Sequence, residues 1–63
     1  MENDLKQRRA TDELSQADLG EAVGVSRQTI NAIERGRYDP SLALAFELAD
    51  HFDCRIEDIF TPK

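Results

Sequence analysis

Apolar residues recur along most of the chain at the three- and four-residue spacing of a helix face, and no stretch alternates with the period of two that a half-buried strand shows. Polar capping residues and helix breakers divide this pattern into five helical segments. The expected segments span residues 3–10, 15–24, 26–35, 40–52 and 56–60. We therefore expect an all-α fold of five helices without a substantial strand.

The second and third segments carry the clearest helix-end signals. Ser15 and Ser26 are N-cap residues, and Asp18 follows Ser15 at the capping-box position. Gly24 supplies the left-handed backbone in which helices often end. The residues that would hold the two helices at a fixed, steep angle are the apolar Leu19, Val23, Val25, Ile30 and Ile33 and the small Gly20. Residues 16–35 therefore predict a helix-turn-helix unit, whose second helix enters the DNA major groove; an αα-hairpin that only builds core is the alternative.

The outward-facing residues of the third segment favour DNA contact. Arg27 and Gln28 stand in its first turn, from which side chains reach base edges. Arginine reads guanine and glutamine reads adenine through paired hydrogen bonds. Both could instead form a solvated first turn, although an arginine at the positive end of a helix dipole is slightly unfavourable. Their small or polar neighbours, which would share this surface, are Ser26, Thr29, Asn31 and Ala32.

The charge of the chain is unusual for a DNA-binding protein. Thirteen acidic residues against eight Lys and Arg give a net charge of −5, whereas DNA-binding domains are usually basic. The positive charge is concentrated, because residues 26–38 hold three Arg and one Glu while acidic residues predominate on both sides. Only two of the eight bases are Lys. This acid-rich, lysine-poor composition resembles that of proteins from salt-loving microbes, so we expect a halophile as the source.

The length of 63 residues predicts a single domain over 1–63, too small to hold both a core and a roomy catalytic cleft. One cysteine excludes an internal disulfide, and the sequence shows no metal-ligand cluster or cofactor motif. His51 and Cys54 titrate nearest to neutrality, and a solvated histidine beside a buried thiol is a simpler interpretation than a catalytic dyad. We therefore expect no enzyme, cofactor, metal or small-molecule ligand. Without an apolar leader or membrane-spanning stretch, a cytoplasmic protein is expected.

A family resemblance covers nearly the whole chain. It rests on the run VGVSRQTINAIERGRYDPSLALAFELA, with LSQADLGEA before it and IEDIF after it. These stretches resemble the Cro and phage-repressor (Xre) family of helix-turn-helix regulators, in its short single-domain branch. The resemblance implies a five-helix lambda-repressor-like fold, sequence-specific binding to a double-stranded DNA operator and regulation of transcription, with repression as the expected outcome. The alternative is a protein-interaction module of the same fold, such as an antitoxin.

Matching positions take expected roles from the family. Gln16, at the start of the second helix, would contact phosphate. Arg27 and Gln28 would contact bases, with Ala32 facing the groove one turn further on. The residues that would grip the DNA backbone after the recognition helix are Arg35, Arg37 and Tyr38.

Three positions depart from the family's pattern. Glu13 and Asp53 stand where family members often carry a turn glycine, and Arg55 stands where a small hydroxyl residue often caps the last helix. Each departure weakens a turn or cap by up to about 1 kcal/mol. The sequence alone therefore does not define the geometry of these turns, although the fold is unaffected. Arg9 and Glu34, by contrast, are expected to form a partly buried ion pair between the first and third helices.

The last expected helix indicates how the protein assembles. One recognition helix covers half of a typical operator, so two half-sites about 34 Å apart require a homodimer with a two-fold axis. Residues 55–63 are the expected dimer segment, because Ile56, Ile59 and Phe60 form an apolar stripe on a helix too short to be stable alone. The alternative is that this helix only covers the core.

Overall fold

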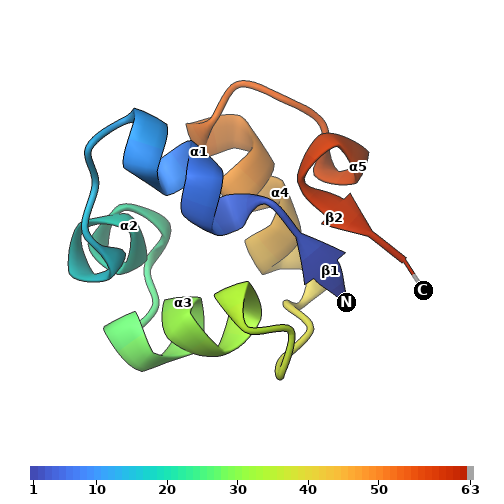
Figure 1. The fold of residues 1–63 in the computed structure, drawn as a ribbon, viewed down its shortest axis with the longest axis horizontal. Coiled ribbons are helices and arrows are strands. Elements are labelled where there is room, and N and C mark those ends of the chain that lie inside the picture. The colour runs from blue at the N-terminus through green and yellow to red at the C-terminus, as the bar shows by residue number, and fades with distance from the viewer. Residues whose placement is uncertain (63) are drawn as a thin grey trace.

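The computed structural model describes residues 1–62, in which five α-helices and two short β-strands surround one core (Figure 1). The elements follow in the order β1 (Glu2–Asn3), α1 (Leu5–Thr11), α2 (Gln16–Val23), α3 (Arg27–Glu34), α4 (Leu42–His51), α5 (Ile56–Ile59) and β2 (Phe60–Thr61). The Cα trace measures 27 × 22 × 20 Å along its principal axes. No helix in residues 1–62 is long and apolar enough to cross a membrane. Lys63, the last residue of the expected domain and dimer segment, lies outside the described residues.

The five expected helices are confirmed, and three of them begin at a serine cap. The side chains of Ser15, Ser26 and Ser41 each accept a hydrogen bond from the backbone N–H group three residues on. The carboxylate of Asp18 in turn accepts the backbone N–H of Ser15 at 3.1 Å, which completes the predicted capping box. Local sequence therefore sets where α2, α3 and α4 begin.

The two ends of the described chain form a small sheet that the sequence did not predict. β1 and β2 pair antiparallel with Asn3 opposite Phe60, and Figure 1 shows the two strands side by side. The backbone N–H of Asp4 extends this contact by donating to the carbonyl of Ile59 at 3.1 Å. α1 consequently begins at Leu5, later than expected, and Phe60 belongs to β2 and not to the last helix. Strands of two residues are too short to show alternation, so the sequence pattern gives no sign of them.

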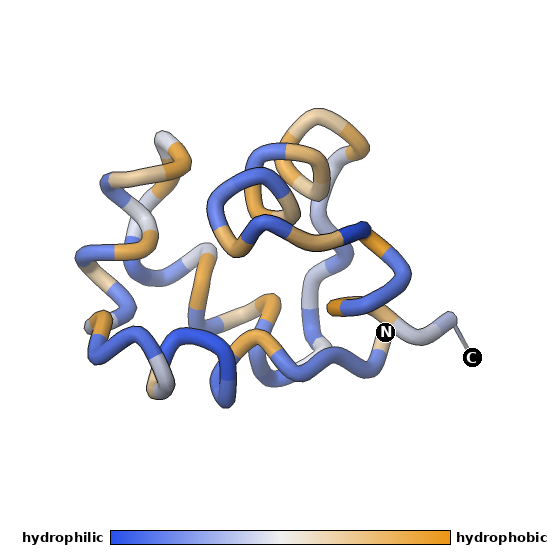
Figure 2. The backbone as a smooth tube through the Cα atoms, turned by 90° about the horizontal axis from the view of Figure 1, so that it is seen from above, coloured by the Kyte–Doolittle hydropathy of each residue, from blue (hydrophilic) through white to orange (hydrophobic). Residues whose placement is uncertain are grey.

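Every helix contributes to one apolar core. The buried apolar residues are Leu5, Leu19, Val23, Ile30, Ile33, Leu44, Ala45, Leu48, Ala49, Ile59 and Phe60. Figure 2 shows apolar positions distributed along the whole chain between hydrophilic ones, as amphipathic helices require. Because α3 contributes two of these residues, its orientation is fixed by packing against the other helices.

Four helices end at a residue in the left-handed conformation. The turn residue is Gly24 after α2 and Gly36 after α3, with φ 81° and 73°, but Glu13 after α1 and Asp53 after α4, with φ 58° and 53°. In each turn the next residue donates its N–H to the carbonyl five residues before it, at 2.9–3.0 Å. This is the hydrogen-bond pattern of the Schellman motif. Glu13 and Asp53 therefore adopt the turn geometry that glycine would adopt, at a steric cost because each has a side chain. At the third departure, the N-cap residue Arg55, the Asp58 carboxylate accepts the backbone N–H of Arg55 at 3.0 Å, and the N–H of Asp58 donates to the backbone carbonyl of Arg55 at 3.1 Å instead of to a hydroxyl cap.

Candidate nucleic-acid interface

The turn between α2 and α3 lies so close to α2 that one position of this helix has no room for a side chain. A Cβ atom on Gly20 would lie 2.6 Å from the carbonyl oxygen of Val25 and 3.2 Å from the backbone of Ser26. In the turn itself, Gly24 adopts φ 81° and reverses the chain. A small residue is thus required at Gly20 as predicted, but the backbone that it contacts is that of the turn and not that of α3.

α3 has one face in the core and one face in solvent. Its two isoleucines are buried, whereas Arg27 and Gln28 are exposed in the first turn. Asn31 and Ala32 are half-exposed further along the helix. The side chains predicted to read bases therefore project from a helix whose opposite face is held rigidly by packing.

Ser26 and Thr29, two further residues of the predicted interface, form the cap of α3. Ser26 Oγ accepts the backbone N–H of Thr29 at 3.2 Å and lies 3.1 Å from the Thr29 hydroxyl oxygen. These bonds order the first turn, from which Arg27 and Gln28 project. Ser26 remains exposed, so its position is compatible with contact to DNA as well as with capping.

Arg35, Arg37 and Tyr38 follow α3 in an exposed loop. The backbone N–H groups of Gly36 and Arg37 fold back onto carbonyl oxygens of the last turn of α3, each at 2.9 Å. These two hydrogen bonds fix the direction in which the loop leaves the helix. The predicted backbone-gripping residues thus lie beyond the C-terminal end of α3, and the predicted base readers lie at its N-terminal end.

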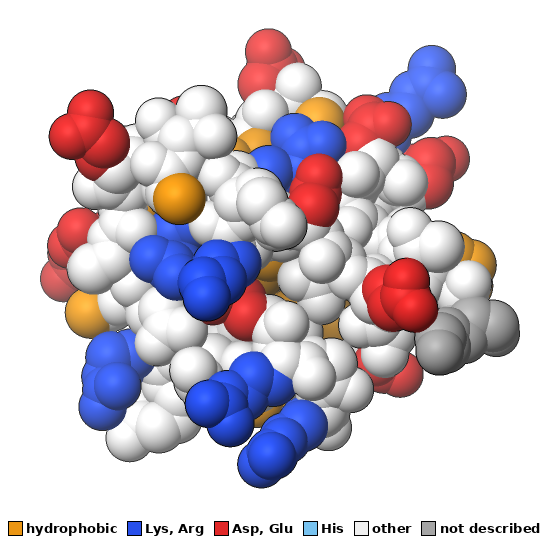
Figure 3. Space-filling model, in the orientation of Figure 1, with side chains coloured by type: hydrophobic (Ala, Val, Ile, Leu, Met, Phe, Trp, Pro, Cys, Tyr) orange, Lys and Arg blue, Asp and Glu red, His pale blue; other side chains and the backbone are white. Residues whose placement is uncertain are grey.

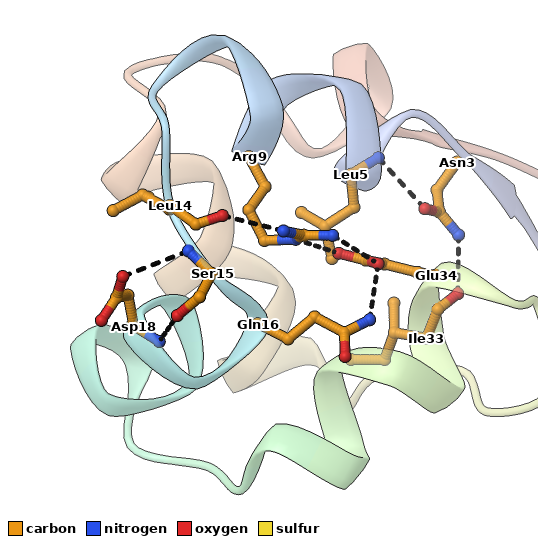
Figure 4. A network of polar contacts seen from close by, with 9 residues as sticks. All are labelled: Asn3, Leu5, Arg9, Leu14, Ser15, Gln16, Asp18, Ile33 and Glu34. Carbon is orange, nitrogen blue, oxygen red and sulfur yellow. Dashed lines mark hydrogen bonds and ion pairs between the residues drawn. The ribbon is translucent and has the colours of Figure 1, made fainter.

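A buried ion pair joins α1 to α3 (Figure 4). Arg9 Nε donates to Glu34 Oε2 at 2.7 Å, and Arg9 Nη2 donates to Glu34 Oε1 at 3.3 Å. The two side chains are 15% and 5% exposed, which confirms the predicted partly buried pair. Arg9 Nη1 also donates to the carbonyl of Leu14 at 2.8 Å, which ties down the turn before α2. The hydrogen bond to Glu34 raises the pKa of Arg9 above its ordinary value, so the guanidinium stays charged.

Gln16 belongs to the same network, although nothing in the sequence indicated this contact. Its Nε2 donates to Glu34 Oε1 at 3.0 Å, and Figure 4 shows the side chain pointing toward this carboxylate. A primary amide carries two N–H groups. The bond to Glu34 therefore orients the side chain and leaves its second N–H group for another acceptor, such as a phosphate.

Charges are separated on the surface as they are along the chain. Figure 3 shows Lys and Arg side chains gathered over the lower part of the view, where Figure 1 places α3, while Asp and Glu are more frequent over the rest of this face. Charges farther apart than a Debye length of about 10 Å are largely screened at moderate salt. A phosphate near α3 therefore meets the local positive charge despite the net charge of −5.

The structure places the three predicted dimer residues in different environments. Ile59 and Phe60 are only 2% and 4% exposed, and they belong to the core, so they offer almost no surface to a partner. For these two residues the alternative interpretation is correct: the last helix covers the core, as a domain this small requires. Ile56 is half-buried. The exposed large apolar side chains on α4 are Leu42 and Phe46, at 69% and 55%.

Neither His51 nor Cys54 has the environment of a reactive group. His51 is exposed, and its ring packs edge-on against Phe52 with the centroids 4.8 Å apart. Burial raises the pKa of the Cys54 thiol above its ordinary value, which disfavours the thiolate that a nucleophile needs. Within residues 1–62, no group of three or more His, Cys, Asp or Glu side chains is placed to hold a metal ion.

Comparison with known sequences gives consistent matches. The helix-turn-helix family model matches residues 5–59. An uncharacterized HTH-type transcriptional regulator of Methanocaldococcus jannaschii is 60% identical over 60 residues, which cover 95% of this chain and 91% of the relative. The uncharacterized HTH-type transcriptional regulator YgzD of Bacillus subtilis is 50% identical over 60 residues, with coverage of 95% and 91%.

Solved structures match as well. The P22 c2 repressor, in a crystal structure with a synthetic operator, superimposes with a TM-score of 0.81 at 30% identity, covering 84% of this chain and 80% of the repressor. The restriction-modification controller protein C.AhdI of Aeromonas hydrophila gives a TM-score of 0.79 at 30% identity, with coverage of 89% and 85%. The five-helix, lambda-repressor-like fold that the sequence implied is thereby confirmed.

Proposed function

The chain belongs to the Cro and phage-repressor (Xre) family of helix-turn-helix transcriptional regulators, and from this we propose that it represses transcription by binding a specific DNA operator with α3 in the major groove. The observation that carries the proposal is the exposure of Arg27 and Gln28 in the first turn of a helix whose other face is fixed in the core. Side chains discriminate between bases only when a rigid element holds them in place.

In this proposal, three residues of α3 contact the bases. Arg27 donates two hydrogen bonds to guanine, and Gln28 pairs with adenine in the same bidentate manner. Ala32, half-exposed one turn further along, meets the methyl group of a thymine. Each bidentate contact discriminates against a wrong base by about 1–3 kcal/mol.

Phosphate contacts on both sides of α3 set the register of the helix in the groove. Gln16 approaches one backbone strand with the N–H group that is not bonded to Glu34. The exposed loop after α3 approaches the backbone at the other end of the helix, through Arg35, Arg37 and Tyr38. These contacts are independent of sequence, so they contribute affinity and salt dependence more than specificity.

A second copy of this chain completes the operator contact. The apolar residues available for it are Leu42 and Phe46, which lie one turn apart on α4, and the half-buried Ile56 of α5. Ile56 lines two hollows: one of about 260 Å³, which Leu42, Ala45 and Phe60 also line, and one of about 370 Å³ beside Phe46. In a two-fold contact, Phe46 of each copy packs against a hollow of the other copy, because the same patch serves both partners.

Selection of bound sequences from random DNA duplexes at several salt concentrations tests this function. We expect enrichment of an inverted repeat whose half-site centres lie about 34 Å apart. If no duplex is enriched above background, DNA binding is refuted and the protein-interaction alternative is favoured. The proposal also implies that the protein acts in the cytoplasm, where it meets the operator. The acid-rich, lysine-poor composition supports a halophile as the source, in which high salt is the working condition.

Sedimentation tests the dimer separately. Phe46→Asp should give a monomer that binds a full operator much more weakly than the wild type does but binds an isolated half-site about equally. Ala10→Asp, which adds the same charge at an exposed position of α1, should remain a dimer. A wild type that sediments as a monomer at tens of micromolar and binds the repeat without cooperativity would refute the dimer. Ile59→Asp is unsuitable for this test, because it would place a charge in the core.

A further inference from the structure

Asn3 connects the end of α3 to the start of α1 and to the sheet (Figure 4). Its Nδ2 donates to the carbonyl oxygen of Ile33 at 2.8 Å, and its Oδ1 accepts the backbone N–H of Leu5 at 3.1 Å. In the sheet, Asn3 lies opposite Phe60. One half-buried side chain therefore links three segments that are far apart in the sequence.

The carbonyl of Ile33 belongs to the turn that directs the loop after α3. The N–H of Gly36 donates to the same oxygen at 2.9 Å, and the N–H of Arg37 donates to the carbonyl of Ala32 at 2.9 Å. A carbonyl oxygen has two lone pairs. Asn3 and Gly36 together satisfy this oxygen, which at a free helix end would be left to water.

The same loop lies against the N-terminal backbone. A Cβ atom on Gly36 would lie 3.4 Å from the carbonyl oxygen of Met1. A hollow of about 420 Å³ on this side of the molecule is lined by Met1, Glu2, Asn3, Glu34, Arg35 and Gly36. The segment that carries Asn3 and the loop that carries Arg35 thus form one surface, and the Asn3 amide donates to the last turn of α3, from which this loop leaves.

We propose that Asn3 is a positioning residue for operator binding: its amide holds the last turn of α3, and with it Arg35 and Arg37, in the orientation that meets the DNA backbone. The inference rests on the proposed function. Without the amide, the loop no longer holds its arginines in the orientation that meets the DNA backbone, so about one phosphate contact is lost and the affinity falls. Arg27 and Gln28 stay in place, because the first turn of α3 has its own cap.

Two substitutions at Asn3 separate this role from the second contact of its side chain, which caps α1 by accepting the backbone N–H of Leu5. Asn3→Ala removes all three side-chain hydrogen bonds of Asn3, which are those to the carbonyls of Ile33 and Met1, the latter at 3.4 Å, and that from the N–H of Leu5. Asn3→Ser keeps an oxygen that can accept the N–H of Leu5, but its side chain is too short to reach Ile33. Gln7→Ala truncates an exposed amide on α1 and serves as the matched control.

Binding to the selected duplex is then measured as a function of salt concentration, with all variants shown to be folded by circular dichroism. We expect both Asn3 variants to bind about 3- to 10-fold more weakly, the effect of one hydrogen bond of ordinary net strength. Their plots of log affinity against log salt should be shallower by about one phosphate contact, with the ranking of single-base operator variants unchanged. Gln7→Ala should match the wild type.

Two binding results would overturn the proposal. Wild-type affinity in Asn3→Ser would show that only the capping of α1 matters. Weaker binding with an unchanged salt slope would show that the phosphate contacts do not depend on Asn3.

Hydrogen exchange in the free protein tests the same contact without DNA. We expect the amide protons of Gly36 and Arg37 to exchange faster in both Asn3 variants, while that of Thr29 in the first turn of α3 is unchanged. Equal exchange rates at Gly36 and Arg37 in wild type and variants would overturn the proposal. A wild type that binds no duplex would instead refute the proposed function, and the exchange rates would still decide whether Asn3 holds the loop.

Discussion

Replacing Glu34 with alanine should destabilise the fold by about 3–5 kcal/mol, the usual effect of removing one partner from a buried ion pair. The Glu34 carboxylate is only 5% exposed and accepts hydrogen bonds from Arg9 Nε, Arg9 Nη2 and Gln16 Nε2. In the variant, Arg9 keeps its bond to Leu14 but leaves a charge and two donors without a partner in a position that is 15% exposed. A domain of this length has a total stability of about 3–9 kcal/mol. Glu34→Ala should therefore lose between about a third of this stability and all of it.

Urea denaturation followed by circular dichroism measures this loss, and a double variant supplies the control. Arg9→Met with Glu34→Leu removes both charges and fills similar volume, so we expect a stability close to that of the wild type. Gln16 loses an acceptor in both proteins, but it is half-buried and can reach water. The reasoning fails if Glu34→Ala loses less than about 1 kcal/mol, or if the double variant loses as much as the single one.

Three further predictions follow from the turns, the cap and the charge. Glu13→Gly and Asp53→Gly should each raise the free energy of unfolding by up to about 1 kcal/mol, and with it the melting temperature, because glycine relieves the left-handed strain at φ 58° and 53°. An unchanged melting temperature in both variants would contradict this strain. Hydrogen bonds from the backbone and side chain of Ser15 lower the pKa of Asp18. The stability from Asp18 is thus present above the ordinary carboxyl pKa and lost as the pH falls through the lowered value, so Asp18→Asn should flatten acid-induced unfolding below the ordinary carboxyl pKa. Identical pH profiles of wild type and variant would count against the cap. Operator affinity should fall with salt less steeply than about −0.9 per phosphate contact, because acidic residues beside the interface take up cations on binding; a slope that equals the contact count would reject this.

Local signals predicted most of the fold. Serine caps, the capping-box Asp18 and the apolar spacing located five helices within a few residues of their observed bounds. Gly20 marked the position where the turn before α3 lies closest to α2, and the Arg9–Glu34 pair formed as expected. These features depend on neighbours in sequence or on a fixed spacing along a helix, and both are visible in one sequence.

Contacts between distant segments could not be predicted in this way. The pairing of Asn3 with Phe60 joins the two ends of the described chain, and strands of two residues have no period to detect. The burial of Ile59 depends on how α5 docks, because an apolar stripe looks the same whether it covers a core or meets a partner. The bond from Gln16 to Glu34 likewise needs α2 and α3 in place.

The most direct test of the central claim compares the operators that wild type, Arg27→Ala and Gln28→Ala select from random duplexes. We expect each variant to lose preference at one position per half-site, at a different position for each residue, with a loss of about 1–3 kcal/mol on the wild-type operator. Lys6→Ala, which removes an exposed charge on α1, should leave the selected sequence unchanged. If both α3 variants instead weaken binding equally to all sequences, these side chains contact only phosphate, and the proposal that the first turn of α3 reads bases is contradicted.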